Sequence, residues 1–273
     1  MRILIATGGA GHSELAVRMG ALLADPAGPH PTILTVIPNP EKKNQAENVI
    51  AKAKALLAAE VPEGQGKIRE GSPAGQILAE AEEGRYDLVV IGEKREHALM
   101  TRLLGSTARK VVENAPCPVL IAKGHIAPIH RILVCDSGAG NRPLLQRFTT
   151  SLRELAEEPV EVVVLHVMSQ ITADSTVPNE QLEADAQQLI RQHTPEGVLL
   201  QEDGRILDEL NVRAELKVRH GPVLEEIRDE AQRGNYDLLV IGAHQSAGWQ
   251  RFLLEDIAYQ IIEQADRPVL IVR

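Results

Sequence analysis

The chain repeats itself. The stretch "RILIATGGAG" from Arg2 returns as "RILVCDSGAG" from Arg131, and the closing stretch "APCPVLIAK" of the first half returns as "ADRPVLIVR". A length of 273 residues is comfortable for two domains, each with a core of its own. We therefore expect two copies of one domain, at 1–124 and 129–273, separated near "KGHIAPIH", where glycine and proline interrupt regular structure.

The two copies differ in length. The offset between matching residues grows from 129 at the start to 150 by Gly71, so about 21 extra residues lie in the middle of the second half. The stretch "SQITADSTVPNEQ" is their expected place.

Each half alternates short apolar runs with helical patterns. Such runs are typical of a parallel sheet with helices on both faces. In the first half the expected strands are 2–6, 32–37, a weak one near 67–70, 87–92 and 118–122, and the expected helices are 13–24, 47–60, 75–84 and 107–115. The predicted fold is α/β, with two tandem doubly wound units, whose ligands bind beyond the carboxyl ends of the strands.

Composition and charge narrow the partners. A net charge of −9 and an aromatic content of 2% disfavour nucleic acid, which requires clustered cations or stacking platforms. No apolar run reaches the roughly 18 residues of a membrane helix, and the start shows no secretory leader, so we expect a cytoplasmic protein without membrane contact. Cys117 and Cys135 lack metal-binding spacing and are interpreted as small apolar residues.

The stretch "YDLVVIG", followed thirteen residues on by "GS" and then by "PCPVLIAK", resembles the universal stress protein family. The likeness covers nearly the whole chain as two tandem units. It implies a five-stranded parallel sheet in the order 3-2-1-4-5 in each unit, and pairing of two units through their last strands. Val119–Ile121 is therefore expected to pair antiparallel with Val269–Ile271 within the chain, and a homodimer is left open.

The resemblance also implies a nucleotide site. In ATP-binding members the pattern Gly-x2-Gly-x9-Gly-Ser/Thr follows the fourth strand. Gly92, Gly105 and Ser106 match it here, whereas Arg95 stands at the second glycine. Backbone N–H groups at the start of a helix attract phosphate, and Ser106 or Thr107 is the expected helix cap. Arg95 brings positive charge together with bulk.

Three further positions complete the expected site. The family's aspartate just past the first strand falls on Gly8, beside Thr7, and the family position that offers backbone groups to the base falls on Val36. The resemblance implies ATP in the first unit, with magnesium only if ATP is bound.

The second half departs from this pattern. Gly242 is kept, Gln245 replaces the second glycine, and Glu255 and Asp256 replace the Gly-Ser pair. Two carboxylates repel a triphosphate, so we do not expect the second unit to bind one in this mode. Asp136 lies one residue before the position of the family's aspartate.

Other motifs have simpler interpretations. A dinucleotide fingerprint starting at Gly9 fails because Glu14 stands where its third glycine belongs, and Ser13 is expected to cap the helix. His166, inside an apolar strand, is interpreted as a buried core histidine. Glu80 is interpreted as a helix-surface acid, and no motif of a nucleophile with a base is found.

The favoured function is a stress-response binding or signalling module, and a dedicated enzyme is disfavoured. Two alternatives stay open at this point. One is a structural or oligomerisation protein in which both nucleotide sites are degenerate, and the other is a slow ATPase.

Overall fold

The computed structural model describes residues 1–61, 63–93, 104–136, 143–152, 155, 160–168, 184–210, 212–242 and 249–272, with the backbone alone for 249–256. The chain forms two compact units. The first consists of Met1–Pro128 with Asp266–Ile271, and the second of Ile129–Ala265 with Val272–Arg273. Among the described helices, none has the length and apolar character needed to cross a membrane.

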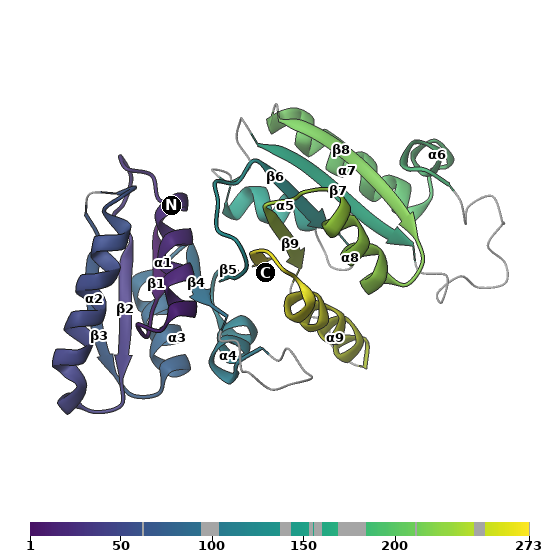
Figure 1. Ribbon diagram of the computed structural model, residues 1–273. Coiled ribbons are helices and arrows are strands. Elements are labelled where there is room, and N and C mark those ends of the chain that lie inside the picture. Colours follow the sequence, from purple (N-terminus) through teal and green to yellow (C-terminus); the bar gives the residue numbers. More distant parts are fainter. Residues whose placement is uncertain are drawn as a thin grey trace. The chain divides into compact units, whose positions relative to one another are not determined.

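The first unit contains a parallel sheet in the order β3-β2-β1-β4-β5, as expected. Its elements are β1 (Ile3–Ala6), α1 (Gly11–Leu23), β2 (Thr32–Ile37), the short 3-10 helix η1 (Pro40–Lys42), α2 (Lys43–Leu57), β3 (Gln65–Glu70), α3 (Pro73–Gly84), β4 (Leu88–Gly92), α4 (Ser106–Asn114) and β5 (Val119–Ala122). Helix α1 packs against α2, and α3 against α4 (Figure 1). With right-handed crossovers these pairs cover opposite faces of the sheet.

The last strand of the chain completes the sheet of the first unit. Strand β10 (Val269–Val272) lies antiparallel to β5. The paired residues are Val269 with Ile121, Leu270 with Leu120, and Ile271 with Val119. The predicted pairing of the two last strands is thus confirmed, and it covers a fully buried apolar strand that would otherwise be an exposed edge.

Gly124 makes this arrangement sterically feasible. It has a φ of +65°, and a Cβ placed there would lie 1.7 Å from the carbonyl oxygen of Asp266. Only glycine tolerates both the left-handed backbone and so close an approach.

The second unit has parallel strands in the order β9-β6-β7-β8. Its elements are β6 (Arg131–Cys135), α5 (Leu144–Ser151), β7 (Glu161–Met168), α6 (Ala186–Gln192), α7 (Pro195–Leu210), β8 (Arg213–His220), α8 (Val223–Arg233), β9 (Leu238–Gly242) and α9 (Trp249–Gln264). Helix α7 packs against α5 and α6, and α8 packs against α9. Helix α6 has no counterpart among the described elements of the first unit, and the expected insertion at 169–181 lies outside the described residues.

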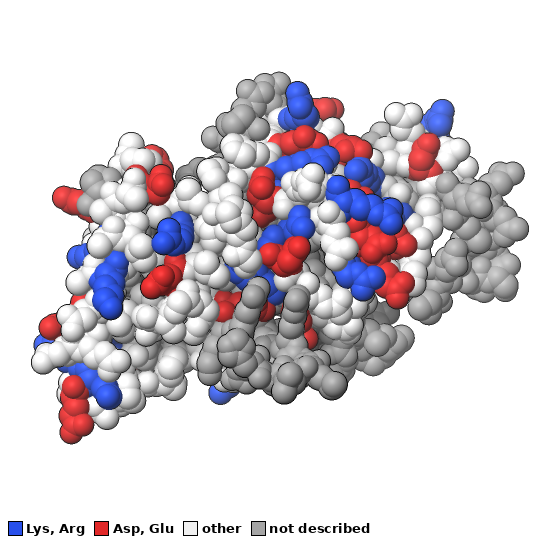
Figure 2. Space-filling model, in the orientation of Figure 1, with Lys and Arg blue, Asp and Glu red and all other residues white. Residues whose placement is uncertain are grey.

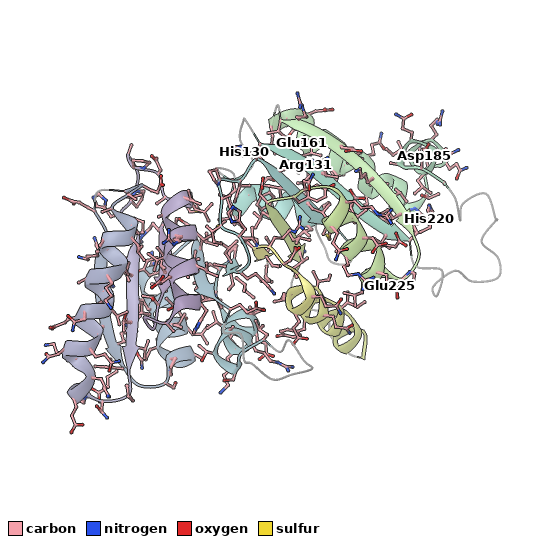
Figure 3. The ribbon with its side chains drawn as sticks, in the orientation of Figure 1. His130, Arg131, Glu161, Asp185, His220 and Glu225 are labelled. Atoms are coloured by element: carbon pink, nitrogen blue, oxygen red, sulfur yellow. The ribbon has the colours of Figure 1, made fainter. Side chains whose placement is uncertain are left out.

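Side-chain carboxylates bond to the first residues of β6 in the second unit and of the chain in the first unit. Arg131 at the start of β6 donates through Nε to Glu161 Oε1 at 3.1 Å, and Figure 3 shows the two side chains together at the ends of neighbouring strands. The backbone N–H of Arg131 donates to Asp237 Oδ2 at 2.9 Å. The carboxylate of Asp87 accepts in the same way from the N–H of Arg2, at 2.6 Å.

A buried glutamate holds the edge strand of the first unit. Glu80 on α3 is only 1% exposed, so its interpretation as a surface acid is wrong. Its carboxylate accepts hydrogen bonds from Lys67 Nζ (2.5 Å), Arg69 Nε (2.8 Å) and the Tyr86 hydroxyl (2.9 Å). We call these four residues the Glu80 cluster. Burial alone raises the pKa of Glu80, but the bonds and charges of its partners outweigh burial and hold it below its usual value.

The second unit contains the same construction, the Glu230 cluster. Glu230 on α8 accepts from Lys217 Nζ (2.9 Å), Arg219 (3.1 Å) and the Tyr236 hydroxyl (2.7 Å). Figure 2 shows cationic and anionic side chains interleaved over this unit on the face drawn. Each cluster joins two cations of an edge strand to the helix that covers it, at matching places in the repeat.

Candidate functional site

A chain of hydroxyl groups organises the loop after β1. Thr7 is buried, and its hydroxyl donates to Ser13 Oγ at 3.1 Å while accepting from the N–H of Gly9 at 3.3 Å. Ser13 Oγ donates in turn to the carbonyl of Ala10 at 2.7 Å. The expectation that Ser13 caps α1 is wrong, because the helix starts at Gly11 and Ala10 is its uncapped N-cap residue.

The end of β2 is tied to the end of β1. The Thr35 hydroxyl donates to the carbonyl of Thr7 at 3.1 Å. Val36, the next residue, is half-buried and pairs in register with Arg69 of β3. Thr7 and Val36 therefore lie at the carboxyl ends of two neighbouring strands.

Gly92 ends β4 directly against the first turn of α1. A Cβ at Gly92 would lie 2.1 Å from the carbonyl oxygen of His12, so a larger residue would push the helix off the sheet. Since β4 and β2 flank β1, the structure brings Gly92, Thr7 and Val36 to one edge of the sheet. This edge is the switch point, where doubly wound folds bind ligands.

The glycines of the β1–α1 loop differ in their surroundings. A Cβ at Gly8 or Gly11 would meet nothing within 4 Å, so the backbone faces open space there. Gly9, in contrast, has a φ of +78° and lies against Val49, whose Cγ2 would be 2.6 Å from a Cβ. The loop thus presents bare backbone beside Thr7.

The N-cap residue of α4 makes no capping hydrogen bond through a side chain. The helix begins at Ser106, and Gly105 is its N-cap residue with no side-chain hydrogen bond. The expectation that Ser106 or Thr107 caps this helix is wrong, because the helix begins one residue earlier than predicted. The N-cap residue therefore supplies no side-chain acceptor to the first N–H groups of α4, which lie at the positive end of the helix dipole. Ser106 is exposed, and Arg95 lies outside the described residues.

The corresponding region of the second unit is built differently. Helix α9 begins at Trp249, so the backbone of Glu255 and Asp256 lies inside a helix, whereas the matching Gly105 and Ser106 lie at a helix start. Interior N–H groups are bonded to the preceding turn and are not offered to a ligand. The side chains of Glu255 and Asp256, and the whole of Gln245, lie outside the described residues.

Ionisable groups replace hydroxyls at the ends of β6 and β7. Asp136 Oδ2 accepts from the N–H of Leu144, at 2.6 Å, at the start of α5. His166 Nδ1 lies 3.1 Å from the carbonyl oxygen of Asp136, and therefore carries the hydrogen of that bond. His166 is 6% exposed, which confirms its interpretation as a buried histidine, and burial lowers its pKa.

Comparison with known proteins identifies the family. The family model described as the universal stress protein family matches twice, over residues 1–123 and 128–273. The chain belongs to the universal stress protein family. The match confirms the resemblance stated from the sequence and makes this chain a tandem, stress-response member of the family.

Several bacterial relatives share parts of the sequence. A universal stress protein of Thermus aquaticus is 40% identical over 29% of this chain, and a stress response protein of Bacillus subtilis is 30% identical over 37%. These matches span 56% and 57% of the two relatives. A universal stress protein of Mycolicibacterium smegmatis is 26% identical over 91% of this chain and 82% of its own.

Solved structures support the fold. A universal stress protein from Archaeoglobus fulgidus superposes with a TM-score of 0.72 at 14% identity, covering 100% of this chain and 98% of that one. A functionally unknown protein from Pseudomonas aeruginosa gives a TM-score of 0.64 at 16% identity, covering 99% and 92%. Together they show that the family's doubly wound α/β architecture extends over both halves.

One buried ion pair in this family member escaped sequence analysis. Lys123, just past β5, donates through Nζ to Glu93 Oε1 at 2.8 Å, and both residues are buried. Glu93 directly follows Gly92, so the pair lies at the carboxyl ends of β4 and β5. Within the described residues, no three His, Cys, Asp or Glu side chains gather as a metal site.

Proposed function

We propose that this chain is a cytoplasmic stress-response binding and signalling module, and that its first unit holds an adenine nucleotide. The observation that carries the proposal is the uncapped start of α4, preceded by Gly105, on the strand connection that follows β4. Phosphates at Gly92, Gly105 and Ser106 would accept hydrogen bonds from backbone N–H groups and be attracted by the helix dipole.

The rest of the nucleotide would occupy the neighbouring strand ends. Thr7 and Gly8 border the open backbone after β1, and Val36 offers its backbone to the base. Arg95 is the proposed cation beside the phosphates, and magnesium would accompany ATP. No protein group of catalytic type is assigned, so binding without dedicated turnover is the proposed activity.

The second unit is not a triphosphate site in this proposal. At Glu255 and Asp256 the backbone is internal to α9, and the two residues bring negative charge. A carboxylate about 4 Å from a phosphate charge repels it by about 4 kcal/mol at an effective dielectric constant of 20. Since about 1.4 kcal/mol is tenfold in affinity, two such contacts cancel a micromolar site.

Titration calorimetry with ATP and magnesium tests the assignment. We expect one site per chain in the wild type and a loss of at least about tenfold in affinity in Gly105→Glu, because a carboxylate then occupies the start of α4. Asn114→Glu, which adds the same charge at the other end of α4, is the matched control and should bind normally. The double variant Glu255→Gly with Asp256→Ser should also keep the first-unit site.

Two results would reject the assignment: binding that survives Gly105→Glu, or binding that requires the second-unit carboxylates. Mass spectrometry of ligand released from freshly purified, denatured protein separates the alternatives. An empty protein that also fails to bind ATP favours the structural role, and steady phosphate release favours the slow ATPase.

A further inference from the structure

The two units can be compared residue by residue at the switch point. Asp136 occupies the position of Thr7. The N–H of Asp136 donates to the carbonyl of Leu165 on β7 at 3.1 Å, and the N–H of Thr7 donates to that of Leu34 on β2 at 2.9 Å. His166 occupies the position of Thr35. The His166 ring bonds the carbonyl of Asp136, and the Thr35 hydroxyl bonds the carbonyl of Thr7, each at 3.1 Å. The second unit therefore carries ionisable groups where the first carries hydroxyls.

A third ionisable group lies beneath them on α7. At the offset of 150 that matches Gly71 to Gly221, Asp203 corresponds to Ala53 of α2, which is 4% exposed. Asp203 is 0% exposed and occupies the middle of the buried face of its helix, between Leu200 and Leu207. A carboxyl group thus stands where the first unit buries a methyl group.

The Asp203 carboxyl has no hydrogen-bond partner among the residues that the structure describes. Within that part of the chain neither of its oxygens makes a hydrogen bond, although almost every buried polar group in a folded protein does. A buried carboxylate without a donor or a counter-ion is so costly that the group takes up a proton instead.

The charges that most affect the pKa of Asp203 do not compensate its burial. They are those of Asp136, at the end of β6, and Glu202, on α7 itself, and both are negative. The other charged or titratable groups on the elements packed against α7 include Arg147 on α5, Arg191 on α6, His166 on β7, and Lys217, Arg219 and His220 on β8. Each of these six has a hydrogen-bond partner other than Asp203. In the part of the chain that the structure describes, Arg147 bonds only through its Nη1 group, and its buried Nε, like the Asp203 oxygens, makes no hydrogen bond.

Three of these six side chains, all on β8, are held by bonds to α8 and to the chain just before α6. His220 at the end of β8 lies with Nε2 3.0 Å from the carbonyl of Ala184, just before the Asp185 that caps α6, and Figure 3 labels His220 and Asp185. Lys217 and Arg219 belong to the Glu230 cluster under α8. Within the described residues, no cation makes a hydrogen bond or an ion pair with Asp203.

We propose that Asp203 is a proton-binding switch of the second unit: the protonated carboxyl lets α7 pack on the sheet, and loss of the proton loosens α7 beside Asp136 and β7. The first unit lacks this switch because Ala53 has nothing to titrate. At this position, therefore, only the second unit has a group that can bind a proton.

The direction of the response follows from linkage. Burial, followed by the charges of Asp136 and Glu202, raises the pKa of Asp203 from 3.8 to about 8. The packed state therefore holds a proton that the opened state releases above pH 3.8, so packing is strongest in acid, weakens as pH rises, and levels off above about 8. His166, whose pKa is lowered from 6.5, acts in the opposite direction, and mainly below pH 6.5. A comparison of the wild type with a variant that keeps His166, made between pH 6.5 and 8, therefore isolates Asp203.

Hydrogen–deuterium exchange of the α7 peptides, read by mass spectrometry at pH 6.5 and 8, tests the switch in the full chain. Comparing variants at one pH cancels the intrinsic effect of pH on exchange. From pH 6.5 to 8 the exchange of α7 in the wild type, relative to Asp203→Asn, should rise on the order of tenfold. Asp208→Asn, an exposed acid on the same helix, is the control and should follow the wild type.

Further readouts keep the proposal falsifiable. Asp203→Ala copies the first unit and should behave as Asp203→Asn, and peptides of α2 should show the same exchange in all variants. In carboxyl carbon NMR, the resonance absent from Asp203→Asn should titrate near pH 8. A titration near 4, or a ratio of exchange rates unchanged between the two pH values, overturns the proposal.

Discussion

Tyr86 in the first unit and Tyr236 in the second donate to Glu80 and Glu230 at 2.9 and 2.7 Å, and each acid also binds two cations of an edge strand. At the carboxyl ends of two matching strands the units differ. At the ends of β1 and β2 the first unit has hydroxyls and bare glycine backbone, whereas at the ends of β6 and β7 the second has a carboxyl group and an imidazole. The groups that fasten helix to sheet are the same in both units, whereas the groups that meet a ligand or a proton differ.

The largest expected effect comes from breaking the part that is alike. Glu80→Ala leaves the Tyr86 hydroxyl and two cations without their buried acceptor. Removing one partner of a buried ion pair costs about 3 to 5 kcal/mol, and the partial exposure of Lys67 favours the lower end. Glu230→Ala should cost as much in the second unit, measured as a fall in the urea midpoint.

Glu82→Ala is the matched control, because Glu82 is an exposed acid on the same helix as Glu80 and should have little effect. If only one of the two cluster variants loses stability, the clusters are not equivalent, and the comparison fails at its most similar point.

A smaller effect is expected at His166, one of the positions where the units differ, when the stability is measured as a function of pH. Burial lowers the pKa of His166 from 6.5, so its contribution to stability is present above pH 6.5 and is lost as pH falls toward the lowered value. The loss amounts to at most about 1.4 kcal/mol for each pH unit in that range. His166→Thr, the residue of the first unit, should therefore narrow the fall in thermal midpoint between pH 6.5 and 5.

For this measurement His125→Thr is the control, because His125 is exposed and its replacement should leave the pH profile as it is in the wild type. A wild-type profile for His166→Thr would mean that His166 does not titrate as a buried group.

The smallest expected effect concerns the hydroxyl chain of the first unit. Thr7→Val removes the bonds to Ser13 and to the N–H of Gly9, at a cost of about 1 kcal/mol in the free energy of unfolding. Thr150→Val, at an exposed position on α5, should cost less. Equal urea midpoints for the two variants would show that the hydroxyl chain contributes nothing to stability.

Much of the fold was predictable because the sequence contains two copies of the same domain pattern. The repeated "YDLVVIG" and "PVLI" stretches indicated where β4, β5, β9 and β10 lie, and the proline before each last strand helped predict that Val119–Ile121 pairs with Val269–Ile271. Strand order followed from the family resemblance, and the doubly wound arrangement from the handedness of crossovers.

The side-chain environments were harder to predict. Glu80 has the spacing of a surface acid, and its burial depends on an edge strand that is weak in sequence. Asp203 follows Glu202 in a polar stretch, so the sequence shows a solvated pair and only the packing of α7 reveals a buried carboxyl. The start of α4 was missed by one residue, which is within the usual uncertainty of a helix boundary but moves the cap to Gly105.

The position of β10 in the first unit bears on how the chain is made. As the ribosome releases the polypeptide from its N-terminus, β1 to β5 emerge together, but the strand that covers β5 emerges only after the whole second repeat. Until then the finished half displays a buried-type apolar strand as an open edge, a site where another nascent chain can pair. The sheet of the half that is translated first is therefore completed only when the last strand of the chain, β10, pairs with β5.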